Sequence, residues 1–385
     1  MFKNGIIKTI LKGTLFRAMT LINRLIPKNQ NVVLLYIANK GIRHSLIPLR
    51  KYLLDNAYDS KYKIYCGIEH MKYADNESRV KFVAGVRAIM VFLKAGHVFY
   101  TVGQIPIKPS KSQMVFHLRH GNANFKSSGS KAQLGTGDEF FFTYMIAPSD
   151  YYVPIMAEEY GCSINNIKVA GDPLCDLLLN APRDKYDFCK YSKLLVWVPT
   201  FRKSEYLGHD DSMMDSIIPL FTEEDFPEIN CLLEKYNIHL IVKLHAAQTL
   251  KRGVECQLSH LCVYNHQEFC DNNYDLYTLM AQSDGLIGDY SSASMQYLLL
   301  DRPMAFVVPD LDDYGRTRGF VFDQPEDYMA GHIVKTKDEF YHFIDDFAKG
   351  KDVYREKRHW VCDQIYKYKD AHSCERIVKL NGMTL

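Results

Sequence analysis

Residues 285–303 read GLIGDYSSASMQYLLLDRP, and this stretch predicts how the chain folds. The apolar run GLIG is followed at once by Asp289, Tyr290, Ser291 and Ser292, and then by a segment with the composition of a helix. A buried strand that passes directly into a helix is the first half of a βαβ unit, which builds parallel sheets. The carboxylate and the two hydroxyls therefore lie at the carboxyl end of a strand, where α/β proteins bind their ligands.

The same pattern recurs on both sides of this stretch. Short β-branched or aromatic runs lie upstream at VVLLYI (32–37), KIYCGI (63–68), HVFYTV (97–102), MVFHL (114–118), FFFTYMI (140–146) and IKVAG (167–171). A second series comprises LLVWVPT (194–200), HLIVKLH (239–245), LCVYN (261–265), GLIGDY (285–290) and MAFVVPD (304–310). The polar segment NAPRDKYDFCKYSK (180–193) lies between the two series and is the predicted linker.

Two successive α/β series predict two Rossmann-like domains whose parallel sheets face a central cleft. We expect the first domain at residues 31–178, the second at 190–350, and helices at 351–385. A ligand of such a protein lies outside the carboxyl ends of the strands, between the domains.

Composition places the chain among soluble proteins with two domains. It has 385 residues, of which 47% are apolar and 24% charged, and this is about twice the usual length of one domain. The 10 cysteines form no CxxC pair and show no zinc-ligand spacing, which favours reduced thiols in the cytosol and predicts no metal site. The net charge is only +2, and we expect no nucleic-acid partner.

Positive charge is concentrated near the N-terminus, where ten Lys or Arg residues precede the first acidic residue, Asp55. Within residues 1–30, apolar side chains recur every three or four positions with basic ones between them. The apolar positions are Ile7, Leu11, Leu15, Met19, Ile22 and Ile26, and the basic ones are Lys3, Lys8, Lys12, Arg17 and Arg24. This pattern predicts a basic amphipathic helix that contacts an anionic membrane surface. The alternative is a helix packed on the domain with its basic residues in solvent.

Polar residues gather at the ends of four predicted strands, in RHGN (119–122), PTFRKS (199–204), KLH (243–245) and GDYSS (288–292). These four ends could converge on one cleft. The chain has no GxGxxG motif, no P-loop lysine motif and no paired metal carboxylates. An anion site must therefore be built from helix ends and cationic side chains.

Two of these segments contain groups suited to phosphate. Ser291 and Ser292 would cap the following helix, whose free amides attract phosphate, or they are ordinary helix caps. Arg202 leaves a strand end at a fixed turn and could fork onto phosphate oxygens, or it is a solvated loop arginine.

Two histidines and a further arginine complete the candidates. His120 precedes the permissive Gly121 and has the intrinsic pKa of a general base, or it is a structural histidine. His245 could donate to a phosphate or satisfy a backbone carbonyl. Arg318, in YGRTRGFVFD (314–323), is another cation near a strand end.

Taken together, these motifs resemble the CDP-glycerol:poly(glycerophosphate) glycerophosphotransferase family, the teichoic acid priming and polymerising enzymes and their capsule relatives. The resemblance runs from about residue 30 to the C-terminus. His120-Gly121 with Lys126 and Gly129 resembles the family's His-Gly-Thr-Pro-Leu-Lys segment, and GDPLCD (171–176) resembles its Gly-x-Pro-Arg-x-Asp. Further segments match in the same order: VPTFR (198–202), KLH (243–245), GDYSS (288–292) with LDRP (300–303), and VPDLDDYGRTRGFVFD (308–323).

The chain departs from the family pattern at four places. Residues 122–124 replace a Thr-Pro pair with one apparent extra residue, Leu174 stands where an Arg is usual, and Ala246 replaces a Pro. Met295-Gln296 occupies the place of a usual Phe-Asp. If that Asp reads the polyol, the donor differs from plain CDP-glycerol. Asn122, Lys126 and Gln296 are therefore candidate contacts with the acceptor or the donor.

The resemblance implies a GT-B-like fold with acceptor residues in the N-terminal domain and the CDP-alcohol in the C-terminal one. It implies that His120 is the catalytic base and His245 a second catalytic residue. The implied donor and pyrophosphate site comprises Thr200, Arg202, His245, Asp289, Ser291, Ser292 and Arg318. With no carboxylate cluster to hold magnesium, the positive groups His245, Arg202 and Arg318 would replace a metal, so we expect no cofactor and activity that is independent of metal.

The implied function is transfer of glycerol phosphate from CDP-glycerol to a hydroxyl of a lipid-linked or polymeric glycan acceptor, with release of CMP, in teichoic acid or capsule-type polymer synthesis. The expected location is the cytoplasmic face of a bacterial membrane, as a peripheral protein. It stays open whether the donor is CDP-ribitol, whether the protein acts as a primase or a polymerase, which acceptor it uses, and whether it forms a homo-oligomer. Two rival functions are a GT-B glycosyltransferase that uses a nucleotide sugar and a non-catalytic membrane-bound scaffold.

Overall fold

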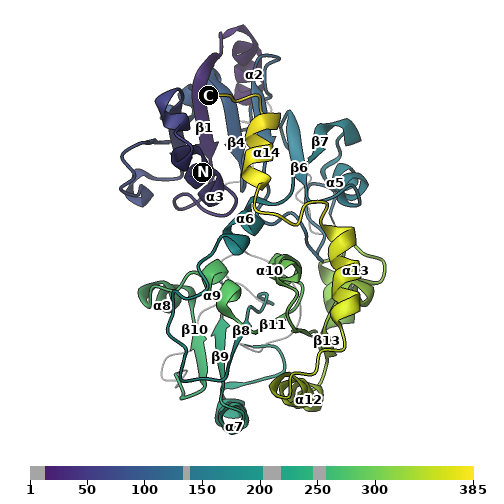
Figure 1. The fold of residues 1–385 in the computed structure, drawn as a ribbon. Helices are drawn as coiled ribbons and strands as arrows, with labels where there is room; N and C mark the ends of the chain where they lie inside the picture. Colours follow the sequence, from purple (N-terminus) through teal and green to yellow (C-terminus); the bar gives the residue numbers. More distant parts are fainter. Residues whose placement is uncertain (1–13, 133–138, 203–217, 246–256) are drawn as a thin grey trace.

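Two parallel β-sheets, one in each half of the chain, organise the fold in a computed structural model (Figure 1). The structure describes residues 14–132, 139–202, 218–245 and 257–385. The first sheet has the strand order β3-β2-β1-β4-β5-β6-β7 and the second β10-β9-β8-β11-β12-β13. In each sheet the order reverses beside the first strand of that half, as in Rossmann folds. The predicted α/β fold of two Rossmann-like sheets is confirmed.

The described part of the N-terminal half contains seven strands and the helices between them. Its strands are β1 (Asn29–Tyr36), β2 (Lys63–Ile68), β3 (Lys81–Ala84), β4 (Ala95–Tyr100), β5 (Met114–His117), β6 (Tyr144–Ala147) and β7 (Ile167–Val169). Its described helices are α2 (Leu15–Leu25), α3 (Leu46–Asp55), α4 (Val86–Lys94), α5 (Tyr152–Tyr160) and α6 (Pro173–Leu179), with short 3-10 turns at η1 (Tyr58–Ser60), η2 (Met71–Tyr73) and η3 (Ile164–Asn166).

The C-terminal half repeats this plan. Its strands are β8 (Lys193–Trp197), β9 (Ile238–Lys243), β10 (Leu261–Tyr264), β11 (Gly285–Gly288), β12 (Met304–Val307) and β13 (His332–Val334). Its described helices are α7 (Phe226–Lys235), α8 (His266–Asp271), α9 (Leu276–Gln282), α10 (Ser292–Tyr297), α11 (Leu311–Thr317), α12 (Lys337–Ala348), α13 (Arg355–Ile365) and α14 (Ser373–Leu380), with 3-10 turns at η4 (Glu223–Asp225), η5 (Leu298–Leu300) and η6 (Pro325–Tyr328).

All eleven strands expected from the sequence are present, and β3 and β13 are additional. Each of these two strands lies at the edge of its sheet and spans only four or three residues. A run that short carries little periodicity, so the sequence did not distinguish it from a loop. The strand expected from Phe140 begins later, at Tyr144.

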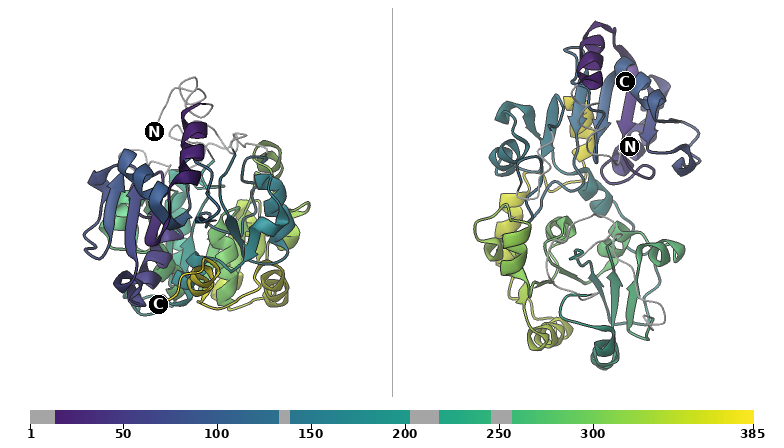
Figure 2. Two further views of the ribbon diagram at one scale, coloured as in Figure 1. Left: turned by 90° about the horizontal axis from the view of Figure 1, so that it is seen from above. Right: turned by 180° about the vertical axis from the view of Figure 1, so that it is seen from behind.

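The last two helices return the chain to the N-terminal half. α13 lies beside the C-terminal half, and α14 crosses to pack near α3 and α6 (Figures 1 and 2). The side chains of Cys374, Ile377 and Val378 belong to the apolar core of the first half. The carboxylate of Asp176 in α6 accepts hydrogen bonds from the backbone N–H groups of Ser373 and Cys374, at 3.0 and 2.8 Å. Helices α13 and α14 therefore connect the two halves.

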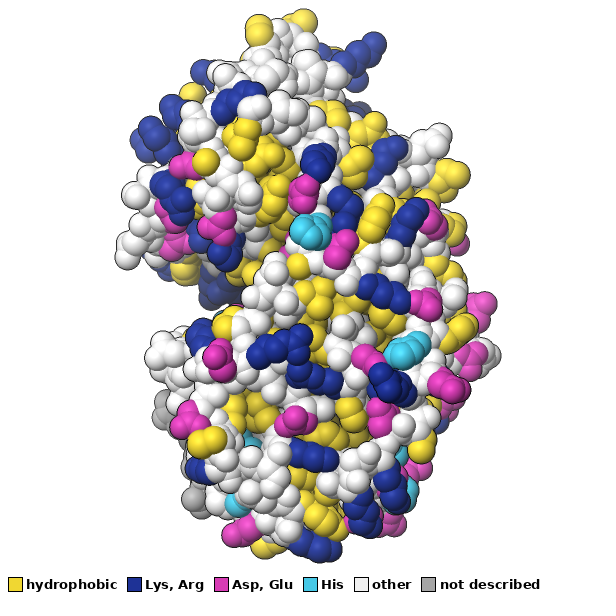
Figure 3. Space-filling view, in the orientation of Figure 1, with side chains coloured by type: hydrophobic (Ala, Val, Ile, Leu, Met, Phe, Trp, Pro, Cys, Tyr) yellow, Lys and Arg dark blue, Asp and Glu magenta, His cyan; other side chains and the backbone are white. Residues whose placement is uncertain are grey.

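A short backbone pairing also joins the halves. The N–H of Ser127 donates to the carbonyl of Gly319 (3.0 Å), and the N–H of Val321 donates to the carbonyl of Phe125 (2.8 Å). Lys126 and Phe320 form the antiparallel bridge between these bonds. On the side opposite α13, the outline of the molecule is notched between the two halves (Figure 3).

Helix α2 lies at the end of the N-terminal half that is farthest from the C-terminal half (Figure 2). One face packs on the domain through Phe16 and Asn23, whose amide donates to the carbonyl of Lys108 and to Gln113. The opposite face leaves four large apolar side chains exposed: Leu15, Leu21, Ile22 and Leu25. Residues 15–25 therefore form a helix that packs on the domain with one face, and the expected contact with a membrane stays a prediction. Its first part, residues 1–13, lies outside the described residues.

Within the described ranges, no helix combines the length and the apolar character needed to cross a bilayer.

Candidate functional site

The predicted site residues follow strands that lie at or beside the reversal points of the two sheets. In the second sheet, Thr200 and Arg202 follow β8 and Asp289 follows β11, and these two strands pair directly. In the first sheet, His120 follows β5, which pairs with β4. Loops at the carboxyl ends of such strands form the ligand crevice of open α/β sheets.

The ring of His120 reaches solvent, although protein crowds it on its other sides. It lies beside the ring of His44, with 5.6 Å between the ring centroids. Exclusion of water by the surrounding protein, the His44 ring, and the charges of Arg119 and Lys126 lower the pKa of His120 well below its ordinary value. Because one side of the His120 ring stays open to solvent, we attribute much of the lowering of its pKa to the charges of Arg119 and Lys126. His120 is therefore a neutral imidazole at neutral pH, the form that accepts a proton.

The second predicted catalytic residue, His245, lies across from this group in the C-terminal half. Its ring also reaches solvent and packs 5.0 Å from the Phe201 ring, centroid to centroid. Burial lowers the pKa of His245 to about 3, with contributions from Lys126, Lys243, His266 and His44. Two of these neighbours, Lys126 and His44, come from the other half of the chain. The structure thus brings His120 and His245 towards one space between the halves.

The groups around this space are almost all cationic or basic. The charges that lower the pKa of His120, His245 and His266 come from lysine, arginine and histidine side chains alone. The contributing lysines and arginines are Arg43, Arg119, Lys126 and Lys243. Among the described residues, no three His, Cys, Asp or Glu side chains are grouped so that they could hold a metal ion. The space between the halves is therefore suited to an anionic ligand.

Arg202 has different partners from those expected. Its Nε and Nη2 fork onto the carboxylate of Asp310 at 2.9 and 3.2 Å, and its Nη1 donates to Asp289 and to the carbonyl of Thr200. The side chain is only 3% exposed. Burial alone would lower the pKa of Arg202, but Asp289 and Asp310 outweigh that effect and raise it. The expectation that Arg202 forks onto phosphate oxygens is thus not met in this structure, because its three nitrogens already donate to two carboxylates and a backbone carbonyl.

Thr200 and Asp289 belong to the same buried network. The Asp289 carboxylate accepts from the N–H of Thr200 (2.8 Å), from its hydroxyl (2.6 Å) and from the N–H of Ser291 (3.2 Å). Asp289 is fully buried and Thr200 nearly so. These two residues shape the end of β8 and the turn into α10, and their polar side-chain atoms are directed at each other.

Ser291 and Ser292 remain at the surface of the space between the halves. Ser291 caps α10, with its hydroxyl accepting from the N–H of Ala293 (3.3 Å). Ser292 lies against Gly121, where a Cβ on the glycine would come within 2.5 Å of the Ser292 hydroxyl. Gly121 has a φ of +125°, a conformation that favours glycine. The His120-Gly121 turn of one half therefore meets the start of α10 in the other.

Gln296 and Asn122 occupy buried positions at the junction of the halves. The Gln296 amide donates to the carboxylate of Asp172 (3.0 Å) and accepts from the Tyr277 hydroxyl (3.2 Å). The same carboxylate accepts from the N–H of Asn122 (3.0 Å), whose side-chain amide donates to the carbonyl of Gly171 (3.1 Å). Both side chains have at most 1% exposure. The structure therefore does not support the expected substrate contacts of Gln296 and Asn122, because their polar atoms bind protein groups at the junction of the halves.

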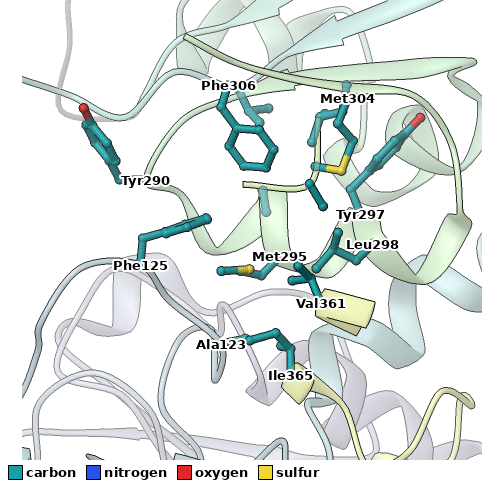
Figure 4. Close-up of a cluster of buried hydrophobic side chains, with 14 of the residues drawn as sticks. Ala123, Phe125, Tyr290, Met295, Tyr297, Leu298, Met304, Phe306, Val361 and Ile365 are labelled. Atoms are coloured by element: carbon teal, nitrogen blue, oxygen red, sulfur yellow. The ribbon is translucent and has the colours of Figure 1, made fainter. Parts of the chain in front are cut away.

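Met295 is also buried. It lies between the N-terminal side chains Ala123 and Phe125 and the C-terminal side chains Phe306 and Val361 (Figure 4). Positions 295 and 296, where the chain departs from Phe-Asp, are thus both buried at the junction of the halves.

Lys126 and Arg318 are partly exposed and lie near the backbone pairing between the halves. The Lys126 ammonium lies 5.9 Å from the centre of the Phe201 ring, and its charge acts on both His120 and His245. Arg318 ends α11, directly before Gly319 of the pairing. Both remain candidate anion-binding residues.

Two neighbours of His120 were not predicted from the sequence. His44 follows β1, and Arg119 directly precedes His120. His44 and Arg119 have left-handed backbone conformations, with φ of +54° and +56° respectively. The side chain of Arg119 donates to the Ser128 hydroxyl at 2.6 Å. A basic residue after a strand, as in GIRHS (41–45), was the available signal for His44, but no motif marked it.

Comparison with known proteins gives one consistent family. The model described as CDP-Glycerol:Poly(glycerophosphate) glycerophosphotransferase matches residues 18–380. The teichoic acid ribitol-phosphate polymerase TarK of Staphylococcus aureus is 26% identical, over 96% of this chain and 72% of its own length. The teichoic acid glycerol-phosphate primase of Bacillus subtilis is 30% identical, over 47% of this chain and 43% of its own length.

Solved structures agree on the fold. The wall teichoic acid polymerase TagF superimposes with a TM-score of 0.72 and 18% identity, covering 98% of this chain and 94% of that chain. A UDP complex of MnaA from S. aureus superimposes with a TM-score of 0.53 and 12% identity, covering 93% of this chain and 98% of that one.

Proposed function

Because the chain belongs to the CDP-glycerol:poly(glycerophosphate) glycerophosphotransferase family, we propose that it transfers glycerol phosphate from CDP-glycerol to a hydroxyl of a lipid-linked or polymeric glycan acceptor. Membership of this family implies polyol-phosphate transfer in teichoic acid synthesis. We propose which donor and which acceptor the protein uses, and which residues act on them. The observation that carries it is the pair His120 and His245, which approach one cationic space from the two halves of the chain.

In the proposed reaction, neutral His120 takes the proton of the acceptor hydroxyl as that oxygen attacks the phosphorus bearing the polyol. A new P–O bond to the acceptor forms, the P–O bond of the pyrophosphate breaks, and CMP leaves with the electron pair. The low pKa of the free His120 does not oppose this role. A bound pyrophosphate adds negative charge beside the ring and so raises the pKa towards the value that a general base needs.

The charge that develops on the phosphoryl oxygens requires nearby donors. We propose Lys126, Arg318 and His245 for this role, together with the Ser291-Ser292 turn. Arg202, Thr200 and Asp289 contribute indirectly, because their buried network fixes the turn that presents Ser291. We keep the prediction that the reaction needs no metal.

CDP-ribitol is the second candidate donor. The specific observation in its favour is that the S. aureus relative matched over 96% of this chain bears the name of a ribitol-phosphate polymerase. The burial of Met295 and Gln296 removes the earlier reason to choose between the two polyols from those positions.

The test is a donor panel. Purified protein is mixed with a lipid-linked teichoic acid precursor and with CDP-glycerol, CDP-ribitol or a UDP-sugar, and both CMP release and the mass of the lipid product are measured. We expect a CDP-polyol to be consumed at the same rate with and without EDTA. Turnover of UDP-sugars but of neither CDP-polyol would favour a glycosyltransferase. Donor binding without turnover on any acceptor would favour a scaffold.

We further propose that the protein works as a peripheral protein on the cytoplasmic face of the membrane. In support, the exposed face of α2 combines large apolar side chains with Arg17 and Arg24. Hydrophobic and basic side chains lie together at that end of the molecule (Figure 3). A lipid-linked acceptor would be reached from such a position.

A further inference from the structure

His44 lies in the loop between β1 and α3, next to the candidate base. The loop follows the first strand of the sheet, beside which the strand order reverses. The ring centroid of His44 is 5.6 Å from that of His120, with 58° between the ring planes. The loops that carry the two rings are joined, because the Ser45 hydroxyl donates to the carbonyl of Arg119 at 3.1 Å. The positions of the two loops are therefore fixed relative to each other.

The backbone of His44 has a φ of +54°. Glycine adopts this left-handed conformation freely, whereas a side chain with a Cβ is strained there. Such strain persists where the surrounding structure enforces it, and it clusters at functional sites. The loop already contains a glycine with positive φ, Gly41, yet a bulky ring stands at residue 44. The loop thus holds an imidazole ring beside His120 at a position whose backbone a glycine would also allow.

The chemistry of the ring suits hydrogen bonding to an anion. Burial, with the charge of Arg43, lowers the pKa of His44 to about 4, so at neutral pH the ring is uncharged and has one N–H donor. Within the described part of the chain, neither ring nitrogen of His44 has a hydrogen-bond partner. The groups that face His44 include His120 and Arg43. His44 also contributes to the lowered pKa of His245 in the other half.

We propose that His44 is a further substrate-contacting residue whose N–H donates to a non-bridging oxygen of the phosphoryl group being transferred. This rests on the proposed function. An acceptor oxygen held by His120 lies about 3 Å from that ring and must approach the phosphorus to about the same distance. The neighbouring ring is then within reach of an oxygen on the same phosphorus. His44 gains and loses no proton in this step.

The test compares two substitutions of His44 that the backbone tolerates. His44→Gly relieves the strain and removes the ring, and His44→Asn tolerates positive φ while keeping an N–H donor. We expect the glycine variant to unfold at the same or a higher denaturant concentration than wild type. Its kcat for CMP release should fall about 10²-fold with the KM for the donor nearly unchanged, as for loss of one transition-state donor. The asparagine variant should recover part of the rate. His70→Ala, at an exposed histidine outside this group, should match wild type.

A donor with sulfur in place of one non-bridging oxygen on the transferred phosphorus gives a second readout. Sulfur accepts hydrogen bonds poorly, so one diastereomer should slow wild type more than His44→Gly. Equal slowing by both diastereomers in both proteins, or a glycine variant within twofold of wild-type kcat, would overturn the role of His44 while leaving the proposed function intact. If wild type released no CMP from CDP-glycerol or CDP-ribitol, the proposed function would fail and the role of His44 with it.

Discussion

A histidine acts as a base only while it is neutral, and the surroundings of His120 keep it neutral. Crowding by protein, His44 and the charges of Arg119 and Lys126 all oppose its protonation. A pKa below the ordinary value of 6.5 means that the neutral form persists as the pH falls through 6.5. The residue thus stays competent in mildly acidic solution, where an unperturbed histidine would already be charged.

We therefore expect kcat/KM for CMP release to keep its plateau below pH 6.5 and to fall only at lower pH, because kcat/KM reports the free enzyme. Lys126→Gln removes one charge that opposes protonation of His120, so the acid limb of the kcat/KM profile of this variant should move to higher pH. His120→Ala should lower kcat by about 10²- to 10⁴-fold, with His70→Ala as the control. An alanine variant as fast as wild type would show that another group is the base.

Arg202 gives a second prediction at the scale of the residue. Replacing it with alanine leaves Asp289 and Asp310 buried without their counter-ion, so the free energy of unfolding should fall by about 3–5 kcal/mol. Arg87→Ala, at an exposed position of α4, should change it by no more than about 0.5 kcal/mol. Urea unfolding followed by circular dichroism measures both. A loss below about 1 kcal/mol would mean that the carboxylates find other donors.

The sequence pointed to several candidate residues but not to their partners. His120, His245 and Ser292 became candidates because each lies within a few residues of the end of a strand, and their roles stay predictions. The partner of Arg202 could not, because Asp310 lies 108 positions away and only the folded sheet brings it close. His44 was missed for another reason: its left-handed backbone has no signature in the residue type.

At the scale of the element, α10 joins the two halves as well as bordering the candidate site. Its first residue meets Gly121, while Gln296, one turn later, donates to Asp172 at the start of α6. Asp172 in turn accepts from the N–H groups of Asn122 and Leu174. One buried carboxylate thus connects the His120 loop, α6 and α10.

Gln296→Glu tests this connection. Burial already raises the pKa of Asp172, and a second carboxylate beside it would add repulsion without a donor. We expect a loss of about 2–3 kcal/mol in the free energy of unfolding at pH 8. The loss should shrink at pH 5, because protonation of either carboxyl restores a hydrogen bond. Gln296→Met, which removes the bond without adding charge, should lose about 1 kcal/mol at both pH values. A change of polyol preference in Gln296→Met with unaltered stability would instead place this residue in donor recognition.

The sequence predicted central strands better than contacts between elements. Strands such as β2 and β4 are nearly continuous apolar runs, which mark burial on both faces. The inward position of Met295 depends on Ala123, Phe125 and Val361, which come from distant parts of the chain. No local pattern could place them around one helix.

At the scale of the whole molecule, the two halves are held together at several points, by the 125–127 and 319–321 pairing, by Asp172 and by α14. The doubling of the α/β pattern predicted two halves with a site between them. The crossing of α14 onto the first sheet was not predicted, because an amphipathic helix does not show which domain it covers.

The position of α2 gives a prediction for the assembled protein. Its exposed apolar side chains include Leu25, at 83% exposure, and Leu21, at 60%, with Arg17 and Arg24 on the same helix. Entry of each leucine into a bilayer surface would contribute up to about 1.5–3 kcal/mol, and the arginines would add attraction to anionic lipid.

We therefore expect Leu21→Ser with Leu25→Ser to weaken binding to vesicles rich in phosphatidylglycerol by about tenfold or more, measured by co-sedimentation. CMP release with a water-soluble acceptor should be unchanged, because α2 lies far from the site. Val353→Ser provides the matched control, since this apolar side chain is 77% exposed on the C-terminal half. Raising the salt concentration should weaken binding of wild type by screening the arginines. If the double variant bound vesicles as tightly as wild type, the contact with lipid would have to lie elsewhere on the molecule, and a lipid-linked acceptor would reach the histidines from another side.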